Sequence, residues 1–166
     1  MAWETVTTTI ASEFSDLADL EQLTRTVLRL VLAALLGGCL GWQRERDGQE
    51  AGIRTHMLVA ASSALFLLVP QQMGMDEEAT SRVLQGLLAG VGFICAGSIL
   101  KLPEAQRVHG LTTAAGIWMT AAIGVSAGLG REMTAVFSTI LVLCIFLLEK
   151  PLNRLGARRP KPNLRD

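Results

Sequence analysis

Residues 42–59 read WQRERDGQEAGIRTHMLV, and this polar stretch separates two long apolar runs. It holds six charged side chains and a histidine, whereas the flanking runs 30–43 and 57–75 carry no charge over 14 and 19 residues. Three further charge-free runs follow, at 83–100, 110–130 and 133–148, with 18, 21 and 16 residues. A helix needs about 20 mainly apolar residues to cross a bilayer, within a range of about 17–25. Each run therefore predicts a transmembrane helix, and the shorter runs reach this length when neighbouring residues add a turn at their ends.

The overall composition agrees with this pattern. Half of the 166 residues are hydrophobic, 18% are charged, and the mean hydropathy is +0.39. A soluble helical bundle would interleave charged residues with the apolar ones, whereas these runs are apolar all round. We therefore expect an all-α, polytopic membrane protein with five transmembrane helices in one membrane domain, residues 24–150. The formal net charge of zero provides no general basic surface for nucleic acid.

The distribution of basic residues predicts the orientation. With five spans and the N-terminus outside, 11 of the 15 Lys and Arg residues lie on the inner side, as the positive-inside rule requires. The C-terminus is then inside, and residues 151–166 form a basic cytoplasmic tail. Residues 1–23 form an amphipathic or flexible N-terminal segment, because Trp3, Val6 and Ile10 recur at helical spacing among acidic residues.

Small residues recur every four positions in several of the runs. Such stripes let helix backbones approach closely in lipid. They exceed what a five-helix monomer needs, so a homodimer is expected as well. The stripes are Ala33, Gly37 and Gly41; Gly86 and Gly90; and Gly116, Thr120, Gly124 and Gly128.

The polar stretch is the first candidate site. Its alternating charges suit a paired network, and Arg54, Thr55 and His56 lead straight into an apolar run at the expected membrane boundary. The segment 109–113 falls on the same side of the predicted membrane, so the two loops are expected to form one polar cluster. A solvated loop that only obeys the positive-inside rule is the alternative. His56 and His109 could approach each other, although two histidines alone make a weak metal signal.

Other charged residues have simpler interpretations. Arg29 lies near the start of the first run, and the favoured interpretation is that its side chain reaches back to the lipid headgroups. The acidic residues 76–78 could attract a divalent cation but are more simply solvated. No Asp, Glu or Lys lies in the middle of any run, which argues against an ion-coupled transporter. Known catalytic motifs are lacking too, so neither an enzyme nor a cofactor is expected.

Three blocks of the sequence resemble the MgtC/SapB family of bacterial inner-membrane proteins. They are GWQRERDGQEAGIRTHMLV from Gly41, RVLQGLLAGVGFICAGSIL from Arg82 and VHGLTTAAGIWMTAAIG from Val108. The resemblance covers most of residues 25–150. It implies an inner-membrane protein that helps the cell to cope with low Mg²⁺, and in some members with survival inside macrophages. It also implies regulation of another membrane protein or complex, such as the F-type ATP synthase, and not carriage of Mg²⁺. A small transporter or channel for a cation or solute is the alternative.

Two positions depart from the family pattern. The family usually has Glu where Gln43 stands, and Gly where Cys95 stands, so a carboxylate is missing and the third span is expected to pack less tightly. The chain ends 18 residues after the fifth run, so a short form without the family's soluble C-terminal domain is expected. The candidate functional cluster comprises Arg44, Glu45, Arg54, Thr55, His56, Gln85, His109, Thr112 and Thr113.

Overall fold

The computed structural model describes residues 2–13, 19–102 and 107–156, which form helices and one short hairpin. The helices are α1 (Ala2–Glu13), α2 (Leu20–Arg46), α3 (Ile53–Gln72), α4 (Glu77–Gly97), α5 (Leu111–Gly128) and α6 (Glu132–Gly156). The strands β1 (Leu100–Leu102) and β2 (Arg107–His109) pair antiparallel, with Leu100 opposite His109. The predicted all-α class is confirmed, and the expected loop between the third and fourth spans contains this hairpin.

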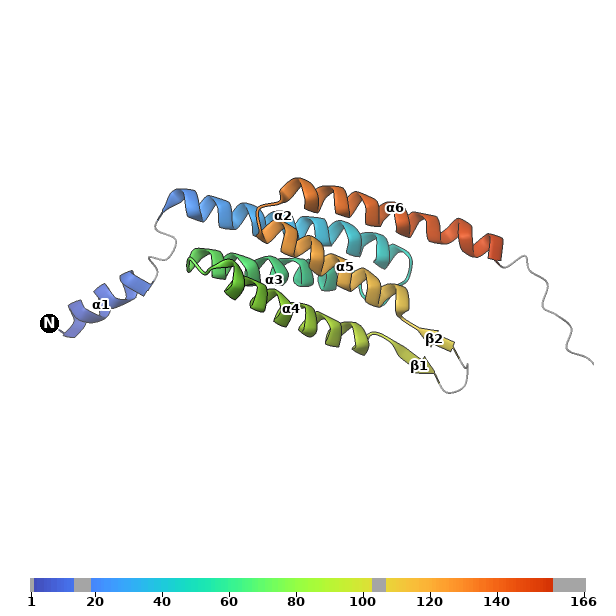
Figure 1. The fold of residues 1–166 in the computed structure, drawn as a ribbon, viewed down its shortest axis with the longest axis horizontal. Helices are drawn as coiled ribbons and strands as arrows, with labels where there is room; N and C mark the ends of the chain where they lie inside the picture. The colour runs from blue at the N-terminus through green and yellow to red at the C-terminus, as the bar shows by residue number, and fades with distance from the viewer. Residues whose placement is uncertain (1, 14–18, 103–106, 157–166) are drawn as a thin grey trace, which may run out of the picture.

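Helices α2 to α6 run up and down side by side (Figure 1). The α2–α3 connection, the β1–β2 hairpin and the start of α5 therefore lie at the same end of the bundle, which we name the hairpin end. The α3–α4 and α5–α6 connections lie at the opposite end. This alternation brings the two loops of the predicted cluster to one end.

Four helices, α2, α3, α4 and α5, are long and apolar enough to cross a membrane by length and composition. In α6 the apolar part is the shorter segment Glu132–Leu148. The count of five spans and the orientation remain predictions. Helices α2, α3, α4 and α6 extend beyond the charge-free runs, because charged residues form some of their first or last turns. The acidic residues 76–78 are an example: Asp76 caps α4 by accepting a hydrogen bond from Ala79 N at 2.8 Å, and Glu77 and Glu78 form its first turn.

Two apolar clusters fill the bundle. The first joins α2, α3, α5 and α6 around buried residues that include Leu40, Ala60, Ile123 and Val142. The second joins α4 to α3 and α5 and includes Cys95, whose thiol donates to the Ala114 carbonyl at 3.2 Å. At the position where the family usually has glycine, Cys95 is thus buried against α5.

Glycines set the distance between three of the helices. A Cβ on Gly37 of α2 would lie 2.9 Å from the Ala60 Cβ of α3, and one on Gly128 of α5 would lie 2.6 Å from the Ala64 carbonyl oxygen. At Gly124 it would overlap the Ala60 carbonyl oxygen. The predicted close packing along α2 and α5 is therefore observed. On α4 it is not: added Cβ atoms at Gly86 and Gly90 would meet nothing described within 4 Å.

At the opposite end of the bundle, the Arg29 side chain of α2 contacts three other helices. Its Nη1 donates to Gln71 Oε1 of α3 and to the Gly128 carbonyl of α5, each at 3.1 Å, and its Nε lies 3.6 Å from the Glu132 carboxylate of α6. Gln71 donates to the same carbonyl at 3.1 Å. The favoured interpretation of Arg29 as a headgroup-facing side chain is therefore wrong. The guanidinium turns inward because three acceptors on neighbouring helices converge on it, which its sequence position does not reveal.

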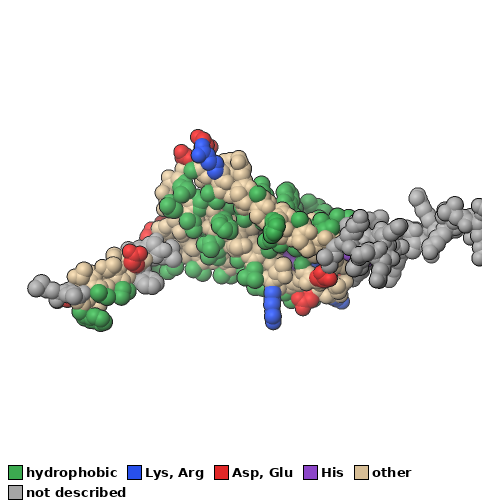
Figure 2. Space-filling model, turned by 90° about the horizontal axis from the view of Figure 1, so that it is seen from below, with side chains coloured by type: hydrophobic (Ala, Val, Ile, Leu, Met, Phe, Trp, Pro, Cys, Tyr) green, Lys and Arg blue, Asp and Glu red, His purple; other side chains and the backbone are tan. Residues whose placement is uncertain are grey.

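Helix α1 carries Trp3, Val6 and Ile10, all exposed, on one face. These three side chains form an apolar face on a helix in part of the N-terminal segment, and residues 14–18 lie outside the described residues. Contact of α1 with a membrane surface remains a prediction, as does the basic tail, whose residues 157–166 are also outside that range. Figure 2 shows hydrophobic side chains spread over the bundle, with charged side chains gathered in small groups toward its margins.

Candidate recognition site at the hairpin end

Two shallow polar recesses at the hairpin end are formed by the loops that the sequence predicts to cluster. The first, about 350 Å³, is lined by Glu45, Arg54 and Thr55 together with Gln49 and Glu50. The second, about 220 Å³, is lined by His109, Gly110 and Thr113, again with Gln49 and Glu50. Since both recesses share residues of the α2–α3 connection, they form one continuous polar surface. We name it the polar rim.

Gln49 joins the two loops directly. Thr113, in the first turn of α5, donates a hydrogen bond from Oγ1 to Gln49 Oε1 at 2.9 Å. Sequence reasoning missed Gln49, because one glutamine among many polar residues gives no periodic or charge signal. Thr112, the next member of the expected cluster, is exposed in the same turn. Gly110, the N-terminal capping residue of α5, has a φ of +89°, a left-handed conformation that favours glycine.

Arg44 and His56 do not lie on the rim. Both are 1% exposed, in the interior of the bundle. Arg44 comes from the last turn of α2, and its guanidinium carbon lies 4.5 Å from the centre of the Phe146 ring of α6. The ring face attracts a cation, which helps to offset the cost of burying the charge. The expected cluster thus divides into an exposed part and a buried part.

His56 reaches across to α5. Its Nδ1 lies 2.7 Å from Thr120 Oγ1, and the Thr120 hydroxyl donates to the Gly116 carbonyl at 2.8 Å. Because a hydroxyl has only one proton to give, we assign Nδ1 as the donor to Thr120. A Cβ on Gly116 would lie 3.7 Å from His56 Cε1 and 3.2 Å from Phe146 Cζ, so glycine leaves room for both rings. Helix α3 begins at Ile53, earlier than the expected start after His56, so His56 lies within its first turn and packs against α5.

Glu45 caps the next helix. Its Oε2 accepts a hydrogen bond from Ile53 N at 3.0 Å, while Gly52, the N-terminal capping residue of α3, has no side chain to do so. The carboxylate also lies at the positive end of the α3 dipole. The Glu45 carboxylate therefore has a structural role in capping α3, in addition to any role in recognition.

Replacing Glu45 by alanine should lower the free energy of unfolding by about 1 kcal/mol, because the α3 N-terminus loses its capping acceptor. Thermal unfolding of the purified protein in detergent measures this change. The matched control is Glu50→Ala, which removes a neighbouring exposed carboxylate and should stay within about 0.5 kcal/mol of the parent. Equal stability of the two variants would contradict the capping role.

Gln85 lies apart from the other candidates. It is exposed in the middle part of α4, well before that helix reaches the hairpin end, so the structure does not bring it to the rim. His109 is exposed at the rim whereas His56 is buried against Thr120, so the two histidines are not brought together either. In the part of the chain that the structure describes, no three His, Cys, Asp or Glu side chains are grouped to hold a metal ion.

An apolar bundle with long spanning helices, closed at one end by Arg29 and carrying a polar rim at the other, defines a polytopic α-helical membrane protein. A family model described as the MgtC family matches residues 30–155. The chain belongs to the MgtC family.

Curated relatives agree with this assignment. Protein SrpB of Synechococcus elongatus is 44% identical over 139 residues, covering 77% of this chain and 76% of that protein. The putative magnesium transporter YhiD of Escherichia coli K12 is 39% identical over 129 residues, 72% of this chain and 58% of YhiD. Protein MgtC of Salmonella typhimurium is 38% identical over 122 residues, 74% of this chain and 51% of MgtC. The chain therefore spans little more than half the length of the latter two, and no solved structure matches it.

Proposed function

We propose that this protein resides in the bacterial inner membrane and modulates a partner membrane protein or complex during magnesium limitation or a related stress. Its role is then one of binding and regulation and not of catalysis. The magnesium connection is supported by the relatives, one of which is named a putative magnesium transporter. The partner is a second membrane protein, with a second copy of this chain as an additional contact.

The observation that carries this proposal is the open face of α4. Glycines of α2 and α5 pack directly against another helix of the same chain, since a Cβ at Gly37 or Gly124 would clash with α3. Those of α4 are different, because a Cβ at Gly86 or Gly90 would meet nothing described within 4 Å. A glycine inside a helix costs up to about 1 kcal/mol relative to alanine, and these glycines gain no packing within the chain in return. Close approach of another transmembrane helix explains them.

The test compares a bulky residue on the open face with one elsewhere. Gly90→Ile should abolish growth support under magnesium limitation and prevent crosslinking from position 89 to a discrete partner, while the purified variant unfolds at the parental temperature. The control, Ala115→Ile, adds the same bulk at an exposed position of α5 and should behave like the parent. Parental growth and crosslinking in Gly90→Ile would overturn the proposal.

Transport of a cation is the competing function, favoured by the printed description of YhiD. Purified protein in liposomes should give no more Mg²⁺ flux than empty liposomes if the protein is a regulator. Flux above that background that disappears with Arg54→Ala or Gln85→Ala would establish the transporter and refute the regulator.

A further inference from the structure

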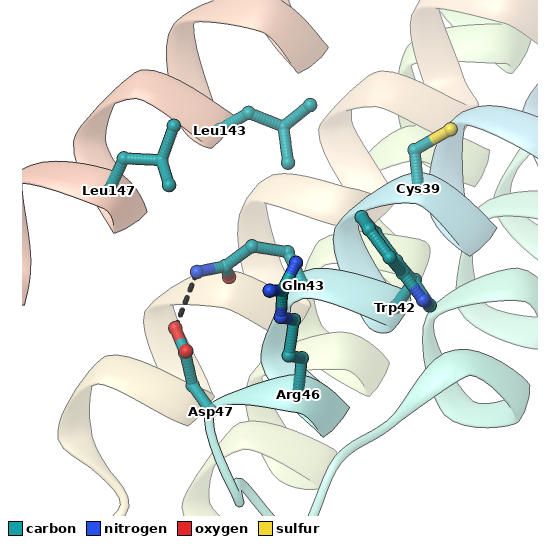
Figure 3. Close-up of a pocket in the computed structure, with 7 residues that line it drawn as sticks. All are labelled: Cys39, Trp42, Gln43, Arg46, Asp47, Leu143 and Leu147. Carbon is teal, nitrogen blue, oxygen red and sulfur yellow. Dashed lines mark hydrogen bonds between the residues drawn. The ribbon is translucent and has the colours of Figure 1, made fainter.

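A groove of about 490 Å³ opens between α2 and α6 at the hairpin end (Figure 3). The polar rim residues Glu50 and His109 do not line it. Its size falls within the range of about 300–1,000 Å³ typical of small-molecule sites. The proposed function does not involve this groove. The residues that line the groove are apolar in one part and polar in the other, and this division indicates the kind of ligand it can bind.

One part of the groove is apolar. Leu143 and Leu147, one turn apart on α6, face Cys39 and Trp42 of α2, as Figure 3 shows. Leu147, Cys39 and Trp42 are exposed, so this apolar channel is open along the side of the bundle and not closed by the chain itself. In a membrane protein, the side of the bundle faces lipid acyl chains.

The other part of the groove is polar and carries a cation. Arg46, in the last turn of α2, extends beside Gln43, and its guanidinium carbon lies 5.7 Å from the centre of the Trp42 ring. The Arg46 side chain is exposed and has no carboxylate partner among the described residues. The nearby Asp47 carboxylate accepts a hydrogen bond from Gln43 Nε2. The ring therefore orients a guanidinium whose donors remain available.

The expected depths of the apolar channel and of Arg46 in the membrane match those of a lipid's acyl chains and headgroup. The charge-free run of α2 ends at Gln43, so Arg46 lies where the apolar span gives way to the headgroup region. Trp42 is the residue type enriched at that boundary. A guanidinium binds a phosphate through two parallel hydrogen bonds, which an ammonium cannot reproduce.

We propose that this groove is a phospholipid site, in which an acyl chain lies along Cys39, Leu143 and Leu147 and the phosphate diester is bound by Arg46. The occupant is a single retained phospholipid that bridges α2 and α6. It differs from the lipids around the protein because it is bound at a cation and between two helices.

The site is tested by native mass spectrometry of the full chain, extracted from bacterial membranes and washed with increasing detergent. The parent should retain one phospholipid per chain. Arg46→Gln removes the guanidinium and should lower lipid occupancy about tenfold, as expected for loss of a charge-assisted hydrogen bond. Cys39→Phe fills the apolar channel and should lower the occupancy to a similar extent, and because Cys39 is exposed the fold should tolerate it.

Two variants control for the general effects of the substitutions. Cys144→Phe adds the same ring at an exposed cysteine of α6 that does not line the groove, and Arg54→Gln removes an exposed arginine at the same end of the bundle. Both should retain lipid as the parent does. The proposal is overturned if the parent retains no stoichiometric lipid, if either groove variant retains it fully, or if the controls lose as much as the groove variants.

Discussion

Replacing Gly124 by alanine should lower the melting temperature of the purified protein by about 10 °C, corresponding to about 3 kcal/mol. The added Cβ would overlap the Ala60 carbonyl oxygen of α3, and it would also lie 2.9 Å from the Ala60 Cα. Backbone atoms cannot move aside as a flexible side chain can. The two helices must therefore separate, which loosens the apolar cluster that contains Ala60 and Ile123.

Gly90→Ala is the matched comparison, because it makes the same substitution in the middle of α4 where the Cβ meets nothing described within 4 Å. The higher helix propensity of alanine predicts unchanged stability or a gain of up to about 1 kcal/mol. Thermal unfolding of both variants in the same detergent measures the difference in their stability. If they unfold at the same temperature, the close contact between α3 and α5 does not limit stability.

Replacing Arg29 by alanine should have a similarly large effect and lower the free energy of unfolding by about 3 kcal/mol. The substitution removes two hydrogen bonds from a charged donor, each contributing about 1.5–3 kcal/mol, and a partly exposed ion pair that adds little. The side chain joins α2 to Gln71, Gly128 and Glu132 on three other helices, so its loss should also loosen the opposite end of the bundle. Faster hydrogen exchange at the start of α6 would report this directly.

Arg25 provides the control on the same helix. It forms an ion pair with Glu21 one turn away, with both side chains largely exposed. Arg25→Ala should therefore cost about 0.5 kcal/mol or less. A headgroup-facing Arg29 would behave in the same way, so equal effects of the two substitutions would restore that interpretation and refute the inward contacts.

The helical class was predictable because apolar runs of spanning length leave the backbone no alternative in lipid but to satisfy its own hydrogen bonds. Helix ends were less predictable. The sequence predicts loops at charged residues such as Glu77 and Arg54, yet both lie in the first turns of helices. Capping by Asp76 and Glu45 stabilises these helix starts outside the apolar runs.

The candidate site was predictable as a region but not as a set of contacts. Motif positions and topology brought the α2–α3 connection and residues 109–113 to one end, and Thr113 indeed bonds to Gln49. The division into a buried pair and an exposed rim could not be foreseen. Whether Arg44 or Glu45 faces the interior depends on the rotation of α2, and adjacent residues of a helix point in directions about 100° apart.

By itself, the sequence determined that this chain forms apolar helices joined by short polar connections, and that its motifs belong to the MgtC family. These properties are local, because they depend on the length of each run and the order of residues within it. Only the tertiary structure decided that Arg29 is turned inward, that His56 meets Thr120 and that the glycines of α4 are left open. Each of these depends on how a helix is rotated and which neighbour it meets, and that outcome depends on the packing of all the helices together.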